Sequence, residues 1–74
     1  MDELLKILQE IKPEVDFTKE DNLIEKKLLD SFDIVKLVAR LSEEFDVAIT
    51  PFDIVPENFK SAEAIYAMLQ RLDD

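Results

Sequence analysis

The chain contains no cysteine, no histidine and no glycine among its 74 residues. Without cysteine and histidine it forms no disulfide, offers no thiolate nucleophile or imidazole acid–base catalyst, and builds no zinc site on those ligands. It also lacks any apolar run of about 20 residues, the length that spans a bilayer, and no signal-peptide pattern opens it. We therefore expect a cytoplasmic protein without a membrane span.

The charge of the chain is strongly acidic. Acidic residues outnumber basic residues by 18 to 9, which gives a formal net charge of −9. Such a field repels nucleic acid and anionic lipid surfaces and attracts basic protein surfaces, or it simply keeps a small domain soluble and monomeric. Hydrophobic residues make up 47% of the chain, too many for disorder. We expect one domain, residues 1–74, whose small core leaves no room for a deep active site.

Apolar residues recur at helical spacing in three segments, so the sequence predicts an all-α fold. Thr50 can cap a helix that begins at Pro51, and Asp53 can close a capping-box-like arrangement with it. Pro56 limits that helix to about one turn, and residues 56–60 are expected to form a turn into the last helix. The result is a small bundle with three longer helices and a short third one. The longer helices are expected at residues 2–11, 31–45 and 61–72, with core stripes of Leu4, Leu8, Ile11, Leu37, Val38, Leu41, Phe45, Ala62, Ile65, Leu69 and Leu72.

Residues 13–29 join the first two predicted helices without a sustained period. Pro13 ends the first helix, because the residue before a proline is driven out of the helical region. A loop of this length in so small a domain is uncommon and often marks function. Single apolar residues are expected to anchor it to the core: Val15, Phe17, Leu23, Ile24, Leu28 and Leu29.

Ser31 opens the second predicted helix, between Asp30 and Asp33. Either Asp30 or Ser31 is the natural N-cap, and the unpaired N–H groups of a helix N-terminus favour a phosphate on the serine hydroxyl. Alternatively, Ser31 only caps a helix in a small, unmodified interaction module. The two aspartates could also act as acid–base groups or bind a divalent ion, but they lack supporting groups and a pocket, so we expect no enzyme.

The stretch from Asp30 to Val38 resembles the motif and second helix of the acyl carrier protein family, and Glu43 to Ile49 is similar to the acidic end of that helix. The resemblance implies a four-helix bundle in which Ser31 receives 4′-phosphopantetheine from coenzyme A through a phosphopantetheinyl transferase. The thiol of that arm would be the only thiol in the protein and would hold acyl or aminoacyl groups as thioesters. Partner enzymes would then perform all the chemistry.

The resemblance also implies where partners bind. Basic surfaces of acyltransferases, synthases or an adenylating ligase would meet the second helix and the loop before it. We expect a monomer, with no metal ion and no nucleic acid partner. The implied partner-binding residues are Asp30, Phe32, Asp33, Val35, Lys36, Arg40, Glu43 and Glu44.

Two departures from the family pattern lie close to Ser31. The glycine that often precedes the serine is absent, so the loop is expected to reach Ser31 with ordinary backbone angles. Phe32 replaces the usual leucine, either as a core or boundary aromatic or as a residue that alters which cargo packs there.

A third departure bears on the pathway. Lys36 and Arg40 stand where carriers of fatty-acid synthesis tend to be acidic or neutral, and they share one helix face. Either they pair with Glu43 or Glu44, or this carrier serves a different set of enzymes. Together with Asp30-Ser31-Phe32 and the stretch 52–59, they make the chain resemble the D-alanyl carrier proteins of Gram-positive bacteria, whose amino acid is loaded by an adenylating ligase. Teichoic acid or nonribosomal peptide synthesis is thus the alternative to fatty-acid synthesis.

Overall fold

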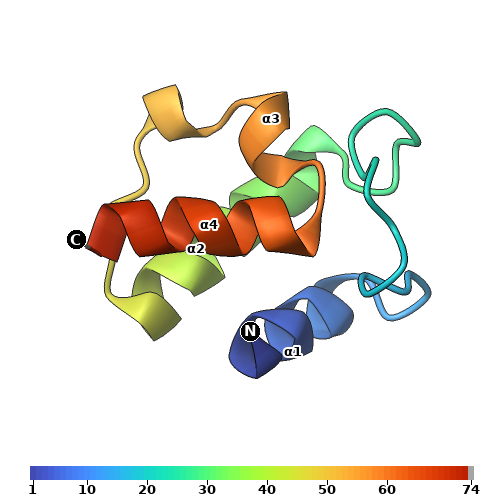
Figure 1. Ribbon diagram of the computed structural model, residues 1–74, viewed down its shortest axis with the longest axis horizontal. Helices are drawn as coiled ribbons and strands as arrows, with labels where there is room; N and C mark the ends of the chain where they lie inside the picture. The colour runs from blue at the N-terminus through green and yellow to red at the C-terminus, as the bar shows by residue number, and fades with distance from the viewer. Residues whose placement is uncertain (74) are drawn as a thin grey trace.

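A computed structural model describes residues 1–73 and shows an all-α fold (Figure 1). The helices are α1 (Asp2–Ile11), α2 (Ser31–Phe45), α3 (Pro56–Phe59) and α4 (Ala62–Asp73), with a 3-10 turn, η1 (Pro51–Asp53), between α2 and α3. No strand occurs in residues 1–73. The prediction of three longer helices and a short third one is confirmed. Asp74, the last residue of the predicted domain, lies outside the described residues.

The helices enclose one apolar core. In Figure 1, α4 crosses in front of α2, with α1 below the pair and α3 above it. The predicted stripes are confirmed at their centres, while Ile11, Val38, Phe45 and Leu72 are half-buried at the edge of the core. The buried apolar residues come from every helix and from the first loop: Leu4, Ile7, Leu8, Val15, Phe17, Leu23, Leu29, Leu37, Leu41, Phe59, Ala62, Ile65, Met68 and Leu69.

The long loop between α1 and α2, residues 12–30, is anchored in the core. Its side chains Val15, Phe17, Leu23 and Leu29 are buried, as the sequence predicts. The backbone N–H of Leu23 also donates a hydrogen bond of 2.8 Å to the carbonyl of Lys60, directly after α3. The segment that leads into α2 is therefore fixed to the rest of the bundle by both side chains and backbone.

Within residues 1–73 of this glycine-free chain, two residues take the left-handed backbone conformation. Lys27 has φ 58° and Asp46 has φ 52°. The expectation that the first loop uses only ordinary backbone angles is therefore wrong, since Lys27 turns the chain where a glycine would fit. A residue with a Cβ atom incurs a cost of about 1–2 kcal/mol there. Asp46, which ends α2, tolerates the conformation better because its short polar side chain can hydrogen-bond locally.

The connection from α2 to α4 differs from the prediction at Pro56. The expected start at Thr50 is confirmed, because its N–H and hydroxyl both donate to Asp53 Oδ2 at 3.0 Å. However, η1 is a single turn, and Pro56 begins α3 where the sequence predicts only a turn. Proline suits this position because the first residue of a helix needs no N–H partner. Ser61 caps α4 as predicted, with its Oγ accepting the Ala64 N–H at 3.1 Å.

Candidate functional site

The turn that begins α2 is closed by a reciprocal pair of aspartates. Asp30 Oδ1 accepts the N–H of Asp33 at 2.8 Å, and Asp33 Oδ2 accepts the N–H of Asp30 at 3.3 Å. Asp30 is therefore the N-cap, and Ser31 is the first residue of the helix. Of the two caps that the sequence allows, the structure has Asp30. Ser31 is exposed, and its hydroxyl has no capping role to fill.

Asp33 also ties this turn to the end of α1. Its Oδ2 atom lies 3.1 Å from Lys12 Nζ, and the Asp33 side chain is only 11% exposed. The hydrogen bond and the charge of Asp33 raise the pKa of Lys12. The backbone N–H of Asp33 lowers the pKa of Asp30, and the charge of Lys12 adds to that effect. Both shifts favour the charged forms of Lys12 and Asp30 near neutral pH.

The position of Asp33 corrects one expectation from the sequence. The resemblance places Asp33 among the surface contacts for basic partners, yet its side chain is largely buried and already paired. The reason is local, because a carboxylate at the third helical position turns back to the N–H of the N-cap. Lys12 is not among the residues that the sequence predicts for this site. The only signal for it in the sequence is a lysine fixed in place by the proline that follows.

Phe32 and Val35 project from the first turns of α2 into solvent. Their side chains are 68% and 69% exposed, so Phe32 is a surface aromatic rather than a core or boundary one. Lys36 Nζ lies 4.9 Å from the centre of the Phe32 ring, within the range of a cation–π interaction. An exposed apolar surface with one cation over it thus adjoins Ser31.

Arg40 reaches back to α1. Its Nη2 atom lies 2.9 Å from Glu10 Oε2. The predicted pairing of Arg40 with Glu43 or Glu44 is therefore wrong, because its guanidinium group lies against α1. The ammonium group of Lys36 contacts the Phe32 ring instead of the predicted glutamates. Glu43 and Glu44 are exposed near the other end of α2.

An apolar groove lies between the first turns of α2 and the segment that enters α3. Ile54 and Val55 are 38% and 39% exposed, and Phe52 in η1 is 92% exposed. The sequence indicates the stretch 52–59 only through its resemblance to the carrier family. The signal for a groove was a run of apolar residues outside any helical stripe. The groove has a volume of about 210 Å³ and is lined by Ile24, Ile34, Ile54, Val55, Pro56 and Phe59.

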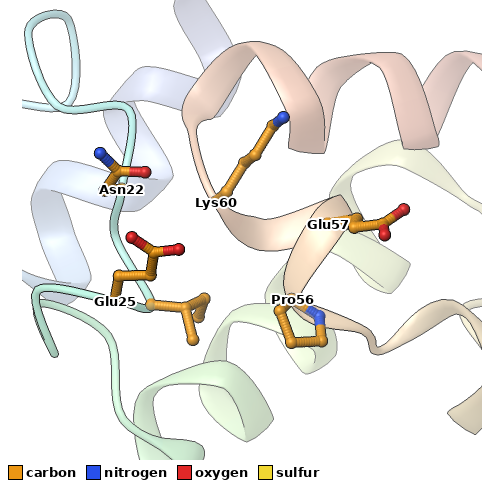
Figure 2. A pocket seen from close by; sticks show the side chains of 6 residues that line it. Asn22, Glu25, Pro56, Glu57 and Lys60 are labelled. Carbon is orange, nitrogen blue, oxygen red and sulfur yellow. The ribbon is translucent and has the colours of Figure 1, made fainter.

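A smaller hollow of about 120 Å³ adjoins this groove, because Pro56 lines both. Figure 2 shows that its walls come from two segments. Asn22 and Glu25 belong to the first loop, whereas Pro56, Glu57 and Lys60 belong to α3 and the residue after it. The hollow also shares Ile24 with the groove, so it extends the apolar surface to a rim of charged and polar residues.

The described residues offer neither a metal site nor a membrane-spanning helix. No group of three or more histidine, cysteine, aspartate or glutamate residues within residues 1–73 is arranged to hold a metal ion. Over the same residues, no helix combines the length and the apolar character that crossing a membrane requires.

A small all-α bundle whose longest helix opens at an exposed serine has the architecture of a carrier domain. The family model of the phosphopantetheine attachment site matches residues 2–69, so the chain belongs to this family. It is 33% identical over 63 residues to aminoacyl carrier protein 2 of Bradyrhizobium diazoefficiens, a match that covers 85% of this chain and 70% of the relative. The protein is thus a phosphopantetheine-binding carrier, which is not an enzyme and acts with transferases and with ligases or synthases.

The start of α2 fits a phosphopantetheine group. Ser31 stands exposed at the N-terminus of a 15-residue helix, where the helix dipole and unpaired N–H groups favour a phosphate. The carboxylate of Asp30 opposes that phosphate, but it is held by the N–H of Asp33. Lys36 follows Ser31 by about one and a half turns of α2, and its ammonium lies over the Phe32 ring. The apolar groove gives the methyl groups of an arm a surface to contact.

Proposed function

We propose that this carrier holds an aminoacyl group on a 4′-phosphopantetheine arm attached to Ser31. The observation that carries the proposal is the cap of α2, where Asp30 fills the capping role and leaves the exposed Ser31 hydroxyl available. The similarity to an aminoacyl carrier protein supports an amino acid as the cargo.

Attachment at Ser31 makes one bond and breaks one. Ser31 Oγ attacks the phosphorus atom of coenzyme A that bears pantetheine. A phosphodiester bond forms as the bond to adenosine 3′,5′-bisphosphate breaks, and the hydroxyl proton passes to a base of the transferase. Once attached, the arm supplies a thiol that holds the cargo as a thioester. The chain itself contributes the nucleophilic oxygen and, through the N-terminus of α2, a favourable field for the phosphate.

The proposed partner-binding surface surrounds Ser31 and follows α2. Apolar side chains that remain exposed give a partner area to bury, and acidic side chains accelerate its approach when its own surface is basic. Asp33 is left out because it is buried, and Arg40 stands at the edge beside Glu10. The surface comprises Asp30, Phe32, Val35, Lys36, Arg40, Glu43 and Glu44.

The proposal extends to the enzymes that act on the carrier and to its state in the cell. A phosphopantetheinyl transferase installs the arm, and an adenylating ligase loads the amino acid. The carrier is proposed to be one domain over residues 1–74, monomeric and cytoplasmic. Its acidic surface supports a monomer, because a net charge of −9 opposes self-association.

The attachment site is tested by mass. The protein is incubated with coenzyme A and a phosphopantetheinyl transferase, and the intact mass is measured for wild type, Ser31→Ala and Ser42→Ala. We expect wild type and Ser42→Ala to gain one phosphopantetheine and Ser31→Ala to gain none. Ser42 is the matched control because it is a serine of the same helix. A wild-type chain that gains no arm, or a Ser31→Ala chain that still gains one, would rule the site out.

The cargo is tested on the protein that already bears the arm. Candidate ligases are supplied with ATP and either D-alanine, other amino acids or fatty acids, and the mass of the loaded carrier is measured. We expect an amino acid to be loaded. The apolar groove favours a fatty acyl chain as the competing cargo, so loading of fatty acids alone would reject the aminoacyl proposal while leaving the attachment site intact.

A further inference from the structure

Within residues 1–73, two ion pairs connect the end of α1 with α2, and they differ in their distance from Ser31 along the helix. Lys12 pairs with Asp33, two residues after Ser31, at 3.1 Å. Glu10 pairs with Arg40, further along α2, at 2.9 Å. The two pairs join the same parts of the bundle at similar distances, although Glu10 and Arg40 are more exposed. The pair further from Ser31 therefore serves as an internal reference for the other.

One oxygen atom joins Lys12 to the cap of α2. Asp33 Oδ2 lies 3.1 Å from Lys12 Nζ and accepts the N–H of Asp30 at 3.3 Å. Asp30 in turn accepts the N–H of Asp33 through Oδ1 at 2.8 Å. Ser31 lies inside this ring of contacts, because both residues that close the ring are its near neighbours in the chain. A shift of the Asp33 carboxylate would therefore move the turn that carries the serine.

Lys12 is itself held in place. Its backbone N–H donates to the carbonyl of Leu8 at 2.9 Å, and its own carbonyl accepts the N–H of Val15 at 3.2 Å. Pro13, the next residue, further restricts the backbone of Lys12. The Lys12 side chain is only 27% exposed and the Asp33 side chain only 11%, which limits the screening of their interaction by solvent. The ion pair thus connects a fixed point at the end of α1 to the start of α2.

We propose that Lys12 and Asp33 are positioning residues for the modification of Ser31, holding its turn against the end of α1 so that the hydroxyl meets coenzyme A in the transferase. The inference rests on the proposed attachment at Ser31. Reaction rates depend steeply on the placement of a nucleophile, and a displacement of about 1 Å can cost up to roughly 100-fold. Neither side chain touches the reacting atoms in this account, since both act through the turn.

The test compares variants of the two ion pairs in the transferase reaction. Lys12→Met removes the ammonium group, Asp33→Asn removes the charge while keeping an oxygen for the N–H of Asp30, and Glu10→Gln breaks the reference pair. The full chain, coenzyme A and one transferase are used throughout, and kcat and KM are measured by mass. Circular dichroism shows whether each variant is folded at the assay temperature.

We expect kcat to fall roughly 10-fold in Lys12→Met and in Asp33→Asn, with little change in KM. Glu10→Gln should stay within about 2-fold of wild type. The double variant Lys12→Met/Asp33→Asn should be no slower than the slower single variant, because both changes remove the same interaction. Lys12→Arg, which keeps the charge and the reach, should restore most of the rate.

Three results would overturn the inference. Equal losses in Glu10→Gln and Lys12→Met would mean that any loosening of α1 against α2 slows the reaction. A rise in KM for Asp33→Asn with no change for Lys12→Met would make Asp33 a direct transferase contact. Wild-type rates in both variants would leave the attachment at Ser31 standing and remove the positioning role, whereas a wild-type chain that gains no arm would reject the proposed function first.

Discussion

The two loops that flank α2 are built in opposite ways. The loop before it, residues 12–30, buries the side chains of Val15, Phe17, Leu23 and Leu29. The segment after it, residues 46–55, contains no buried residue and leaves Phe52 92% exposed. Apolar burial is the main stabilising contribution to a small domain. The first loop therefore contributes to the stability of the bundle, whereas the second adds no fully buried side chain to it.

The difference assigns the two properties that a carrier needs to the two connections of α2. On the N-terminal side, a fixed loop and a capped turn give Ser31 a defined position on the surface. In the connection that follows α2, Ile54 and Val55 remain partly exposed along the apolar groove beside the first turns of that helix, where they can contact an arm, a cargo or a partner. The serine is thus exposed without being on a loosely attached segment.

The largest expected effect comes from exchanging one phenylalanine in each loop for alanine. Phe17 is 2% exposed and Phe52 is 92% exposed. Phe17→Ala should lower the free energy of unfolding by about 3–5 kcal/mol, or unfold the protein at room temperature, because it leaves a cavity in the core. Phe52→Ala should change it by less than about 0.5 kcal/mol. Urea unfolding measures both, and similar losses would remove the contrast between the loops.

A smaller effect separates Asp30 from Ser31 at the start of α2. A serine that caps a helix typically contributes about 1 kcal/mol to stability. Since Asp30 is the cap in this structure, Ser31→Ala should change the free energy of unfolding by less than about 0.5 kcal/mol. Asp30→Ala should lower the melting temperature clearly more than Ser31→Ala. The reverse order in thermal unfolding would make Ser31 the cap and favour the unmodified interaction module.

A third comparison concerns the left-handed residues, one in each loop. Lys27→Gly should raise the free energy of unfolding by about 0.5 kcal/mol, because relief of the backbone cost exceeds the extra entropy of glycine in the unfolded chain. Asp46→Gly should gain less, since aspartate tolerates the conformation better than lysine. A loss of stability in Lys27→Gly would show that the Lys27 side chain contributes more than its backbone costs.

The smallest effect depends on pH. The pKa of Asp30 in the folded protein lies below its ordinary value of 3.8, chiefly because the carboxylate accepts the N–H of Asp33. This contribution to stability is fully present above the ordinary pKa and is lost as the pH falls through the lowered one. Between about pH 6 and pH 3, the melting temperature of wild type should therefore fall further than that of Asp30→Asn. Parallel losses would mean that other carboxylates account for the whole acid response.

The raised pKa of Lys12 predicts that stability falls with rising pH at the alkaline end of the range. Asp33 raises it above the ordinary value of 10.5, so the stabilisation from their pair is fully present below that pH. It is lost as the pH rises through the raised pKa. Lys12→Met should flatten this alkaline part of the stability profile.

The sequence alone predicts the helices well, because their apolar residues recur with a helical period that packing preserves. It does not decide which residue caps α2, since aspartate and serine can both accept the N–H groups of a first turn. The pairs Lys12–Asp33 and Glu10–Arg40 could not be predicted. Each joins segments separated by a loop without periodicity, so nothing local indicates which charges meet.

The short elements show a second limit of the sequence. Pro56 can end one helix or begin another, because proline restricts the residue before it and also suits a first helical position. Packing decides between the two, and Phe59 of α3 is buried in the core. Lys27 shows the same limit for backbone angles, since the anchoring of Leu23 and Leu29 imposes a turn that lysine does not favour.

The anchoring of the first loop has a consequence for proteases. A protease needs several residues of chain to detach and extend into its cleft, and loops ordinarily provide them in proportion to their length. In residues 12–30, detachment would withdraw buried side chains and break the hydrogen bond between Leu23 and Lys60. Residues 46–55 have no buried side chain that would have to be withdrawn. Limited digestion should therefore cut first in the shorter connection and leave the longer loop joined to Ser31.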